Sequence, residues 1–381
     1  MPPIYLDAFA TTPLDPRVGH ELRPWIEGRM SGNAGSPHQV GELAAEALAE
    51  ARRQIAGLVN AAPSSVLITS GATESNNLAL RAADQEGRRH VVACATEHPS
   101  VREPLRALAA DRGVEVTWLR VDRLGNIDLD ELQRGIRRET SLVSVMAANN
   151  ETGTLHPVAD VGAMAATAGV LFHCDAAQAA GKVPVDVARD AVDLLSISAH
   201  KMYGPMGVGA LVVSERAKGL LSPLLRGGGQ EQGLRSGTVN VMGAVGLGAA
   251  CELAAKEMLD EAAHLARLRD RLEEALLSVG GVSVNGDCDR RLPGSLSVTV
   301  EDVPADALLS GCPGLAFSRG SACTSGSPAP SHVLTAMGLT SEEADSTVRF
   351  GLTRFTTEAE VDAAIAQFEL AVDRIRALVH A

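Results

Sequence analysis

The chain has 381 residues, of which 45% are hydrophobic and 21% are charged, and its net charge at neutral pH is −13. A chain of this length usually needs more than one hydrophobic core, so two domains are expected. The acidic balance disfavours direct binding of nucleic acid or of an anionic membrane surface, and the lack of a long apolar run or a secretory signal pattern indicates a cytoplasmic protein.

Short apolar runs alternate with helical patterns through the first 240 residues. At 42–59, for example, apolar residues recur at three- and four-residue steps, which predicts an amphipathic helix. Strands that alternate with helices and are apolar throughout predict a mostly parallel sheet of seven strands with helices on both faces. The expected strands are 66–69, 90–95, 114–119, 142–147, 170–174, 194–197 and 208–213.

The pattern changes after about residue 240. A long amphipathic helix at about 243–279 precedes the strand-like segments "GVSVNG", "GSLSVTV" and "GLAFS", and a final helix begins at about 357. This order predicts a smaller α+β domain, with the long helix as the joint. We expect a large α/β domain at 15–255 and a smaller domain formed by 1–14 and 256–381.

The six cysteines form no CxxC pair, so neither a disulfide framework nor a zinc site is expected. Cys94 and Cys174 lie in apolar strands and should be buried, and Cys312 should pack in a turn. Cys323 differs because its surroundings, "SRGSACTSGSPAP", offer nothing apolar to bury it. An exposed thiol in such a segment is typical of a reactive cysteine, and Arg319 is a candidate to favour its thiolate.

Polar residues follow the expected strands, where an open α/β sheet collects its ligands. The "SGATESNN" segment places Ser70 and Thr73 at a helix start, which suits a phosphate or a plain helix cap. A lone lysine after a strand is usually solvated, and a lone aspartate usually caps a helix. Together, however, the set matches the phosphate, aromatic ring, ring nitrogen and aldehyde of pyridoxal 5′-phosphate. The residues are Thr73, His98, Asn150, Asp175 with Gln178, and Lys201.

A series of sequence motifs along the whole chain supports this interpretation. They include "YLDAFATTPLD", "GNAGSPHQVG", "SGATESNN", "TEHPSV", "DAAQAAGKVPVD", "SAHKMYGPMGVGAL", "RSGTVN", "GSACTS" and "RFGLTRFTTEAE". The sequence resembles the pyridoxal-phosphate cysteine desulfurases, which are fold type I enzymes of the class V aminotransferase superfamily. The "GSAC" form is similar to the subgroup whose cysteine lies on a mobile loop. Met206, where lysine is usual, and Arg319, where a small residue is usual, depart from the family pattern.

The resemblance implies a role for each cofactor-site residue. Lys201 would form the Schiff base, His98 would stack on the ring and shuttle protons, and Asp175 would pair with the ring nitrogen. Gln178 and Asn150 would contact the ring oxygen and its surroundings. The phosphate would be held by Ala72, Thr73, Ser198 and His200, and by Thr238 across the interface of a homodimer.

The resemblance also implies the reaction. Arg349, helped by Asn33, would bind the carboxylate of L-cysteine bidentately, with Arg354 as the competing choice. Cys323 would be the nucleophile that takes the sulfur as a persulfide and passes it to acceptor or scaffold proteins, leaving L-alanine. The destination stays open among iron–sulfur cluster assembly, tRNA or cofactor thiolation and DNA phosphorothioation.

Two other classes of function are alternatives to a desulfurase. The nearest is another enzyme of the superfamily, such as a selenocysteine lyase, a kynureninase or an aminotransferase. A non-catalytic cofactor-binding scaffold is disfavoured because Lys201, Asp175 and Cys323 are all present.

Overall fold

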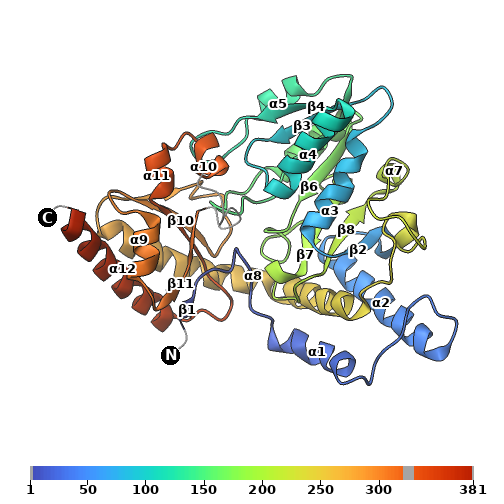
Figure 1. Ribbon diagram of the computed structural model, residues 1–381, viewed down its shortest axis with the longest axis horizontal. Coiled ribbons are helices and arrows are strands. Elements are labelled where there is room, and N and C mark those ends of the chain that lie inside the picture. The colour runs from blue at the N-terminus through green and yellow to red at the C-terminus, as the bar shows by residue number, and fades with distance from the viewer. Residues whose placement is uncertain (1–2, 321–329, 380–381) are drawn as a thin grey trace.

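A seven-stranded sheet forms the centre of the larger half of the molecule (Figure 1). The computed structural model describes residues 3–320 and 330–379. The strand order is β2-β8-β7-β6-β5-β3-β4, and all strands run parallel except β8, which is antiparallel to both of its neighbours. The strands are β2 (Val66–Thr69), β3 (His90–Cys94), β4 (Glu115–Leu119), β5 (Thr140–Ser144), β6 (Leu171–Asp175), β7 (Leu194–Ser198) and β8 (Gly209–Val213). The expected mostly parallel sheet is confirmed.

The strands are apolar throughout because both faces of the sheet are covered. Every residue of β2, β3, β6, β7 and β8 is buried. Successive residues serve opposite faces: Ile68 and Val92 belong to one apolar cluster, and Leu67 and Val91 to another. The helices of this half are α1 (Pro16–Ile26), α2 (Gln39–Leu58), α3 (Ala72–Ala79), α4 (Pro99–Arg112), α5 (Leu129–Gly135), α6 (Val158–Thr167) and α7 (Glu215–Lys218).

The bounds predicted for one strand, 142–147, differ from those in the structure. It begins at Thr140 and ends at Ser144. Beyond that point the N–H of Met146 donates to Oε1 of the buried Glu97 (2.7 Å) rather than to a neighbouring strand. The Glu97 side chain thus takes the place of a β3 carbonyl at this position, while the N–H groups of Val145 and Ala147 still donate to main-chain oxygens of β6.

A second apolar core lies around a four-stranded sheet of order β12-β13-β10-β9, antiparallel throughout. Leu6, Val298, Phe350 and Phe368 are buried in it. The segment "GLAFS" forms two short strands in different sheets rather than one, since β11 pairs with β1. The elements are β1 (Ile4–Tyr5), β9 (Val282–Asn285), β10 (Ser295–Val300), α9 (Ala305–Gly311), β11 (Leu315–Ala316), β12 (Ser318–Arg319), α10 (His332–Ala336), α11 (Ser341–Asp345), β13 (Thr347–Gly351) and α12 (Glu358–Val379).

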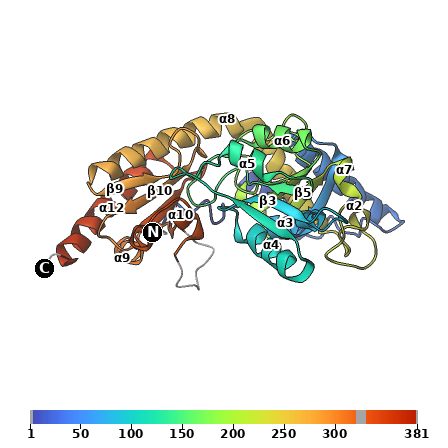
Figure 2. The same cartoon turned by 90° about the horizontal axis from the view of Figure 1, so that it is seen from above.

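Helix α8 (Val241–Ser278) joins the two halves (Figure 2). Its first part packs in the large core through residues such as Leu247, and its later part packs in the second core through Leu265 and Leu272. The expected boundaries at 14/15 and 255/256 stay a prediction. Within the described residues, none of the helices has the length and apolar character needed to cross a bilayer.

Gly209, at the start of β8, provides a test of how the sheet supports the loop after β2. A Cβ atom there would lie 2.6 Å from Gly71 Cα and 2.4 Å from the Ile197 oxygen. We expect Gly209→Ala to lower the free energy of unfolding by about 1–3 kcal/mol, as overpacking does. Denaturant titration of this variant measures the loss.

Gly219→Ala is the matched control, since nothing lies within 4 Å of its Cβ position. It should be neutral or stabilising by about 0.4–1 kcal/mol. Equal stability of the two variants would contradict the close approach of β8 to Gly71.

Candidate active site

A cavity of about 420 Å³ opens at the carboxyl ends of the parallel strands. Its size lies in the range of small-molecule sites. The predicted residues that line it are Ala72, Thr73, His98, Asn150, Asp175, Gln178, Ser198, His200 and Lys201. Residues that the sequence analysis did not assign to the site also line it, among them Phe9, Ala10, Gly71, Ser100 and Met206. Strands far apart in sequence therefore bring the predicted cluster together.

One end of the cavity is suited to an anion. Gly71 has φ +150° and ψ 179°, a conformation open almost only to glycine, and it directly precedes helix α3. The N-terminal N–H groups of a helix and its dipole favour negative charge. Ser198, the last residue of β7, lies beside this turn, since a Cβ on Gly71 would be 3.7 Å from its hydroxyl oxygen. The Gly71–Thr73 turn can therefore hold a phosphate.

Lys201 lies in a short 3₁₀ turn, Ala199–Lys201, directly after β7. Its Nζ donates to the main-chain oxygens of Phe9 (2.6 Å) and Ala10 (2.8 Å). These acceptors come from the N-terminal segment and were missed by the sequence analysis. Backbone carbonyls carry no residue-type signal, so only the "YLDAFATTPLD" motif marked the segment.

A buried hydrogen-bond chain links Asp175 to His98. Asn76 Nδ2 donates to Asp175 Oδ2 (2.6 Å) and to Ser100 Oγ (2.8 Å), and Ser100 Oγ lies 2.8 Å from His98 Nδ1. The N–H of Ser100 also donates to His98 Nδ1 (3.1 Å), because His98 is the N-cap of α4. Since Nδ1 is an acceptor in this cap, the proton of the neutral imidazole lies on Nε2.

Burial keeps the two histidines of the cavity neutral. It lowers the pKa of His98, the Asp175 carboxylate opposes this, and Lys201 lowers the value further. Burial and the charges of Lys201 and Lys182 lower the pKa of His200 to about 4. Both imidazoles are therefore free of charge at neutral pH and can exchange a proton or donate a hydrogen bond.

Lys182 is hydrogen-bonded to Gln178, a residue of the cavity lining. Its Nζ donates to Gln178 Oε1 and to the Gln178 main-chain oxygen, both at 3.1 Å, and lies 5.0 Å from the Phe9 ring centroid. Because Oε1 accepts from Lys182, the amide nitrogen of Gln178 faces the Phe9 oxygen (3.0 Å). Desolvation and then the charge of Lys201 lower the pKa of Lys182 to about 7.

Arg349, Asn33 and Thr238 do not line the cavity. Arg349, in β13, is buried and donates to the Asn150 oxygen (2.5 Å), Ser318 Oγ (3.0 Å) and Asp7 Oδ1 (3.1 Å). Within the described chain its Nε has no hydrogen-bond partner. Arg349 thus contacts Asn150, a residue of the cavity lining, while Asn33 and Thr238 are exposed. Cys323 lies outside the described residues.

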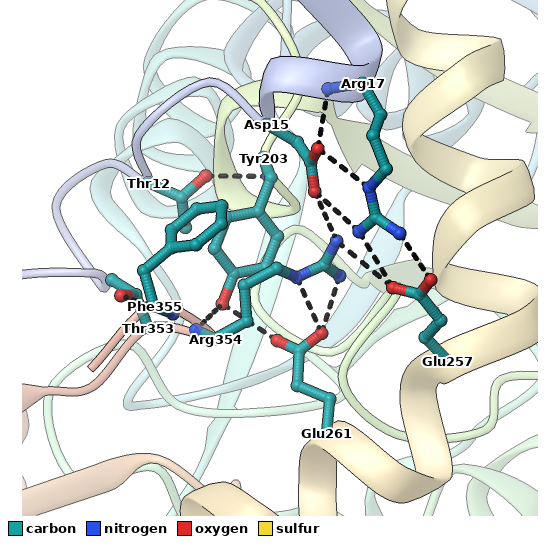
Figure 3. Close-up of polar contacts among 9 residues, drawn as sticks. All are labelled: Thr12, Asp15, Arg17, Tyr203, Glu257, Glu261, Thr353, Arg354 and Phe355. Carbon is teal, nitrogen blue, oxygen red and sulfur yellow. Dashed lines mark hydrogen bonds and ion pairs between the residues drawn. The ribbon is translucent and has the colours of Figure 1, made fainter. Parts of the chain in front are cut away.

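The competing arginine, Arg354, is fully engaged in a buried ion-pair cluster (Figure 3). Its guanidinium pairs with Asp15 (2.8 Å) and Glu261 (2.5 Å) and lies 4.0 Å from the Tyr203 ring centroid. Between the two arginines, these contacts favour Arg349 as the one with hydrogen-bonding capacity to spare.

Arg319 was expected to support the Cys323 thiolate. Its guanidinium pairs with Asp306 (2.9 Å) and Asp345 (3.0 Å). Its effect on Cys323, which lies outside the described residues, stays a prediction. Cys94, Cys174 and Cys312 are buried, as predicted. Among residues 3–320 and 330–379, no group of three or more His, Cys, Asp or Glu side chains is placed to hold a metal ion.

Comparison with known proteins identifies the family. The family model "Aminotransferase class-V" matches residues 4–364. Cysteine desulfurase IscS of Anaeromyxobacter dehalogenans is 47% identical over 378 residues, which cover 98% of this chain and 93% of that protein. The mitochondrial cysteine desulfurase of Eremothecium gossypii is 45% identical, over 99% of this chain and 77% of that protein. The chain belongs to the cysteine desulfurases.

The fold agrees with this assignment. A solved structure of a NifS-like protein superposes with a TM-score of 0.90 at 35% identity, covering 97% of this chain and 99% of that one. Cysteine desulfurases use pyridoxal 5′-phosphate, as the sequence predicted, and this chain is such an enzyme.

The residues of this cysteine desulfurase fit that cofactor. The Gly71–Thr73 turn suits its phosphate, and Asp175 is a buried carboxylate for its ring nitrogen. Asn150 Oδ1 is buried in the cavity wall and, in the described part of the chain, has no hydrogen-bond partner. Buried polar groups are normally paired, so this oxygen is available to accept a hydrogen bond from a bound molecule.

The lowered pKa of Lys182 predicts a pH dependence of stability. The unfolded lysine, with a pKa near its ordinary 10.5, binds a proton between pH 7 and 10.5 that the folded side chain has lost. The free energy of unfolding contributed by Lys182 therefore rises with pH in this window. We expect Lys182→Met to flatten that rise by on the order of 3 kcal/mol between pH 7 and 10. Urea unfolding at several pH values measures it.

Lys256→Met serves as the control because Lys256 is exposed on α8 and pairs with Glu252. It should keep the wild-type slope. A Lys182→Met slope equal to wild type would mean that the ammonium stays protonated throughout this range.

Proposed function

We propose that this enzyme converts L-cysteine to L-alanine and keeps the sulfur as a persulfide on Cys323. The observation that supports this is the meeting of Lys201, Asp175 and His98 at one cavity, in a chain that also carries a "GSAC" cysteine. The reaction balances without an external oxidant. The substrate Cβ–S bond breaks, an S–S bond to Cys323 forms, and the thiol proton of Cys323 is balanced by the hydrogen gained at Cβ.

The cofactor would be held from both ends. Ala72, Thr73, Ser198 and His200 bind the phosphate, with Thr238 supplied by a second copy of the chain. Asp175 holds the proton of the ring nitrogen, while Gln178 and Asn150 contact the ring oxygen. Bound pyridoxal 5′-phosphate supplies the electron sink that makes the substrate α-proton removable.

Lys201 and His98 would handle protons. Lys201 would hold the cofactor covalently, and its free amine would remove the substrate α-proton. The Phe9 and Ala10 oxygens then accept hydrogen bonds from the resulting ammonium. His98, neutral with its proton on Nε2, exchanges protons on the cofactor side of the cavity.

Arg349, with Asn33, would bind the substrate carboxylate. Arg349 contacts Asn150, which itself lines the cavity, and its Nε has hydrogen-bonding capacity left within the described chain. A guanidinium gives a bidentate, charge-assisted contact to a carboxylate.

The persulfide would then pass to an acceptor or scaffold protein, in iron–sulfur cluster assembly, in thiolation of tRNA or cofactors, or in DNA phosphorothioation. We further propose that the enzyme is cytoplasmic and a homodimer. The dimer is supported by Thr238, which is exposed and does not line the cavity of its own chain.

Lys201→Ala should abolish covalent retention of the cofactor. Wild-type protein treated with borohydride and then denatured should keep one cofactor per chain on the peptide that contains Lys201, because reduction makes the linkage permanent. The variant should keep none, as mass spectrometry can show. Lys182→Met, which removes the other lysine near the cavity, should retain the label. Label on the Lys201→Ala protein would refute the assignment.

Cys323→Ser tests the function itself. The variant should bind cofactor and cysteine yet gain no persulfide and release no sulfide, since the serine hydroxyl is a far weaker nucleophile than a thiolate. Mass spectrometry of wild type after limited cysteine should find one added sulfur on the Cys323 peptide. Cys288→Ser, which alters an exposed cysteine, should behave as wild type.

Two results would overturn the mechanism. Added sulfur on Cys312 would identify a different nucleophile. Desulfuration of cysteine by Cys323→Ser at the wild-type rate would instead favour lyase chemistry of the selenocysteine lyase kind, in which the enzyme cysteine is not needed.

A further inference from the structure

Tyr203 has a backbone conformation that is costly for a large side chain. It is 2% exposed and has φ +64°, in the left-handed region that aromatic residues rarely adopt. It follows Lys201 by two residues. Such strain persists only where surrounding contacts hold it, and it concentrates near functional sites.

Both ends of Tyr203 are held. Its N–H donates to Thr12 Oγ1 (2.7 Å), and its main-chain oxygen accepts from the Asp15 N–H (3.0 Å). Its phenol donates to Glu261 Oε1 (2.8 Å) and accepts from the N–H of Arg354 (2.8 Å). Figure 3 shows the ring between the Arg354 guanidinium, at 4.0 Å from its centroid, and Phe355.

The phenol joins two parts of the candidate site that come from different cores. The Ala199–Lys201 turn follows β7 of the large sheet, whereas Arg354 follows β13, which carries Arg349. Only a few residues separate Tyr203 from Lys201, and likewise Arg354 from Arg349. The Tyr203–Arg354 contact therefore constrains the spacing between Lys201 and Arg349.

We propose that Tyr203 is a positioning residue that sets the spacing between Lys201 and Arg349, and so favours amines that carry an α-carboxylate. This inference rests on the proposed function, in which Lys201 acts at the α-carbon and Arg349 binds the carboxylate. A small change in position at either end separates the two groups from one substrate molecule.

Binding of two product-like amines to the holoenzyme tests the proposal without turnover. L-Alanine carries the carboxylate, and ethylamine is the same amine without it. Both are titrated against the absorbance of the bound cofactor. We expect Tyr203→Phe to weaken L-alanine binding by about tenfold, the scale of one lost hydrogen bond, and to leave ethylamine binding unchanged. The KM for L-cysteine should rise with it, with a smaller change in kcat.

Arg17→Gln is the matched control. Arg17 pairs with Asp15 and Glu257 at the outer side of the same cluster, and within the described chain no hydrogen bond, ion pair or ring contact joins it to Tyr203. It should leave the preference for L-alanine unchanged even if it lowers the unfolding temperature. If the cluster served stability alone, Tyr203→Phe and Arg17→Gln would bind L-alanine and ethylamine with the same affinities.

Each remaining outcome counts against the proposal. If Tyr203→Phe weakens the binding of both amines equally, the substitution disturbs the cavity in general. If it weakens neither, Tyr203 does not influence the spacing between Lys201 and Arg349. If wild type itself shows no preference for L-alanine, the carboxylate site in the proposed function is wrong, and this inference fails with it. The first two failures appear only in the variant, so the cases are distinguishable.

If Tyr203→Phe does not fold, fluorotyrosine provides the measurement in the native chain. The sequence has two tyrosines, Tyr5 and Tyr203, so ¹⁹F spectra contain two resonances that Tyr5→Phe assigns. L-Alanine should shift the Tyr203 resonance and ethylamine should not. A Tyr203 resonance unaffected by L-alanine would overturn the proposal.

Discussion

The N-terminal segment, residues 6–12, holds the candidate site together because its backbone is hydrogen-bonded to both cores. The N–H of Ala8 donates to the oxygen of Gly351 at the end of β13 (3.0 Å), and the N–H of Gly351 donates to the oxygen of Leu6 (2.7 Å). On the other side, the N–H of Thr12 donates to the His200 oxygen (2.8 Å). Between these contacts, the Phe9 and Ala10 oxygens accept from Lys201. Gly351 must be glycine for this approach, since a Cβ there would lie 2.5 Å from the Phe9 ring.

This arrangement also determines the electrostatics of the cavity. Lys201 and Lys182 approach Phe9 from different sides, one at its oxygen and one at its ring. Burial, and after it the charge of Lys201, lowers the pKa of Lys182 to about 7. Burial, together with the charges of Lys201 and Lys182, also lowers the pKa of His200 to about 4, so its imidazole is neutral at pH 7.

The sequence predicted the sheet and most cavity residues because buried parallel strands are apolar throughout and end at polar residues. Lys201, Asp175 and His98 were found by residue type and position alone. Main-chain acceptors such as the Phe9 oxygen could not be found, since they depend on the path of the backbone. The end of β5 could not be predicted for a similar reason. Glu97, which follows β3, accepts a hydrogen bond from the N–H of Met146, and this contact depends on how the strands are arranged.

The placement of Arg349 shows the other limit of sequence reasoning. Its residue type and motif predict a substrate-binding group, and in the structure it is held by Asp7, Ser318 and the Asn150 oxygen. Its position relative to Lys201 depends on how the two cores are joined, which no local pattern encodes. Helix α8 packs in both cores, residues 6–12 bond to both, and Arg354 is buried with Asp15 and Glu261 across the joint. Removing one partner from such a buried ion pair leaves an uncompensated charge and costs about 3–5 kcal/mol. The joint therefore resists relative movement of the cores, and with it a change in the spacing between Lys201 and Arg349.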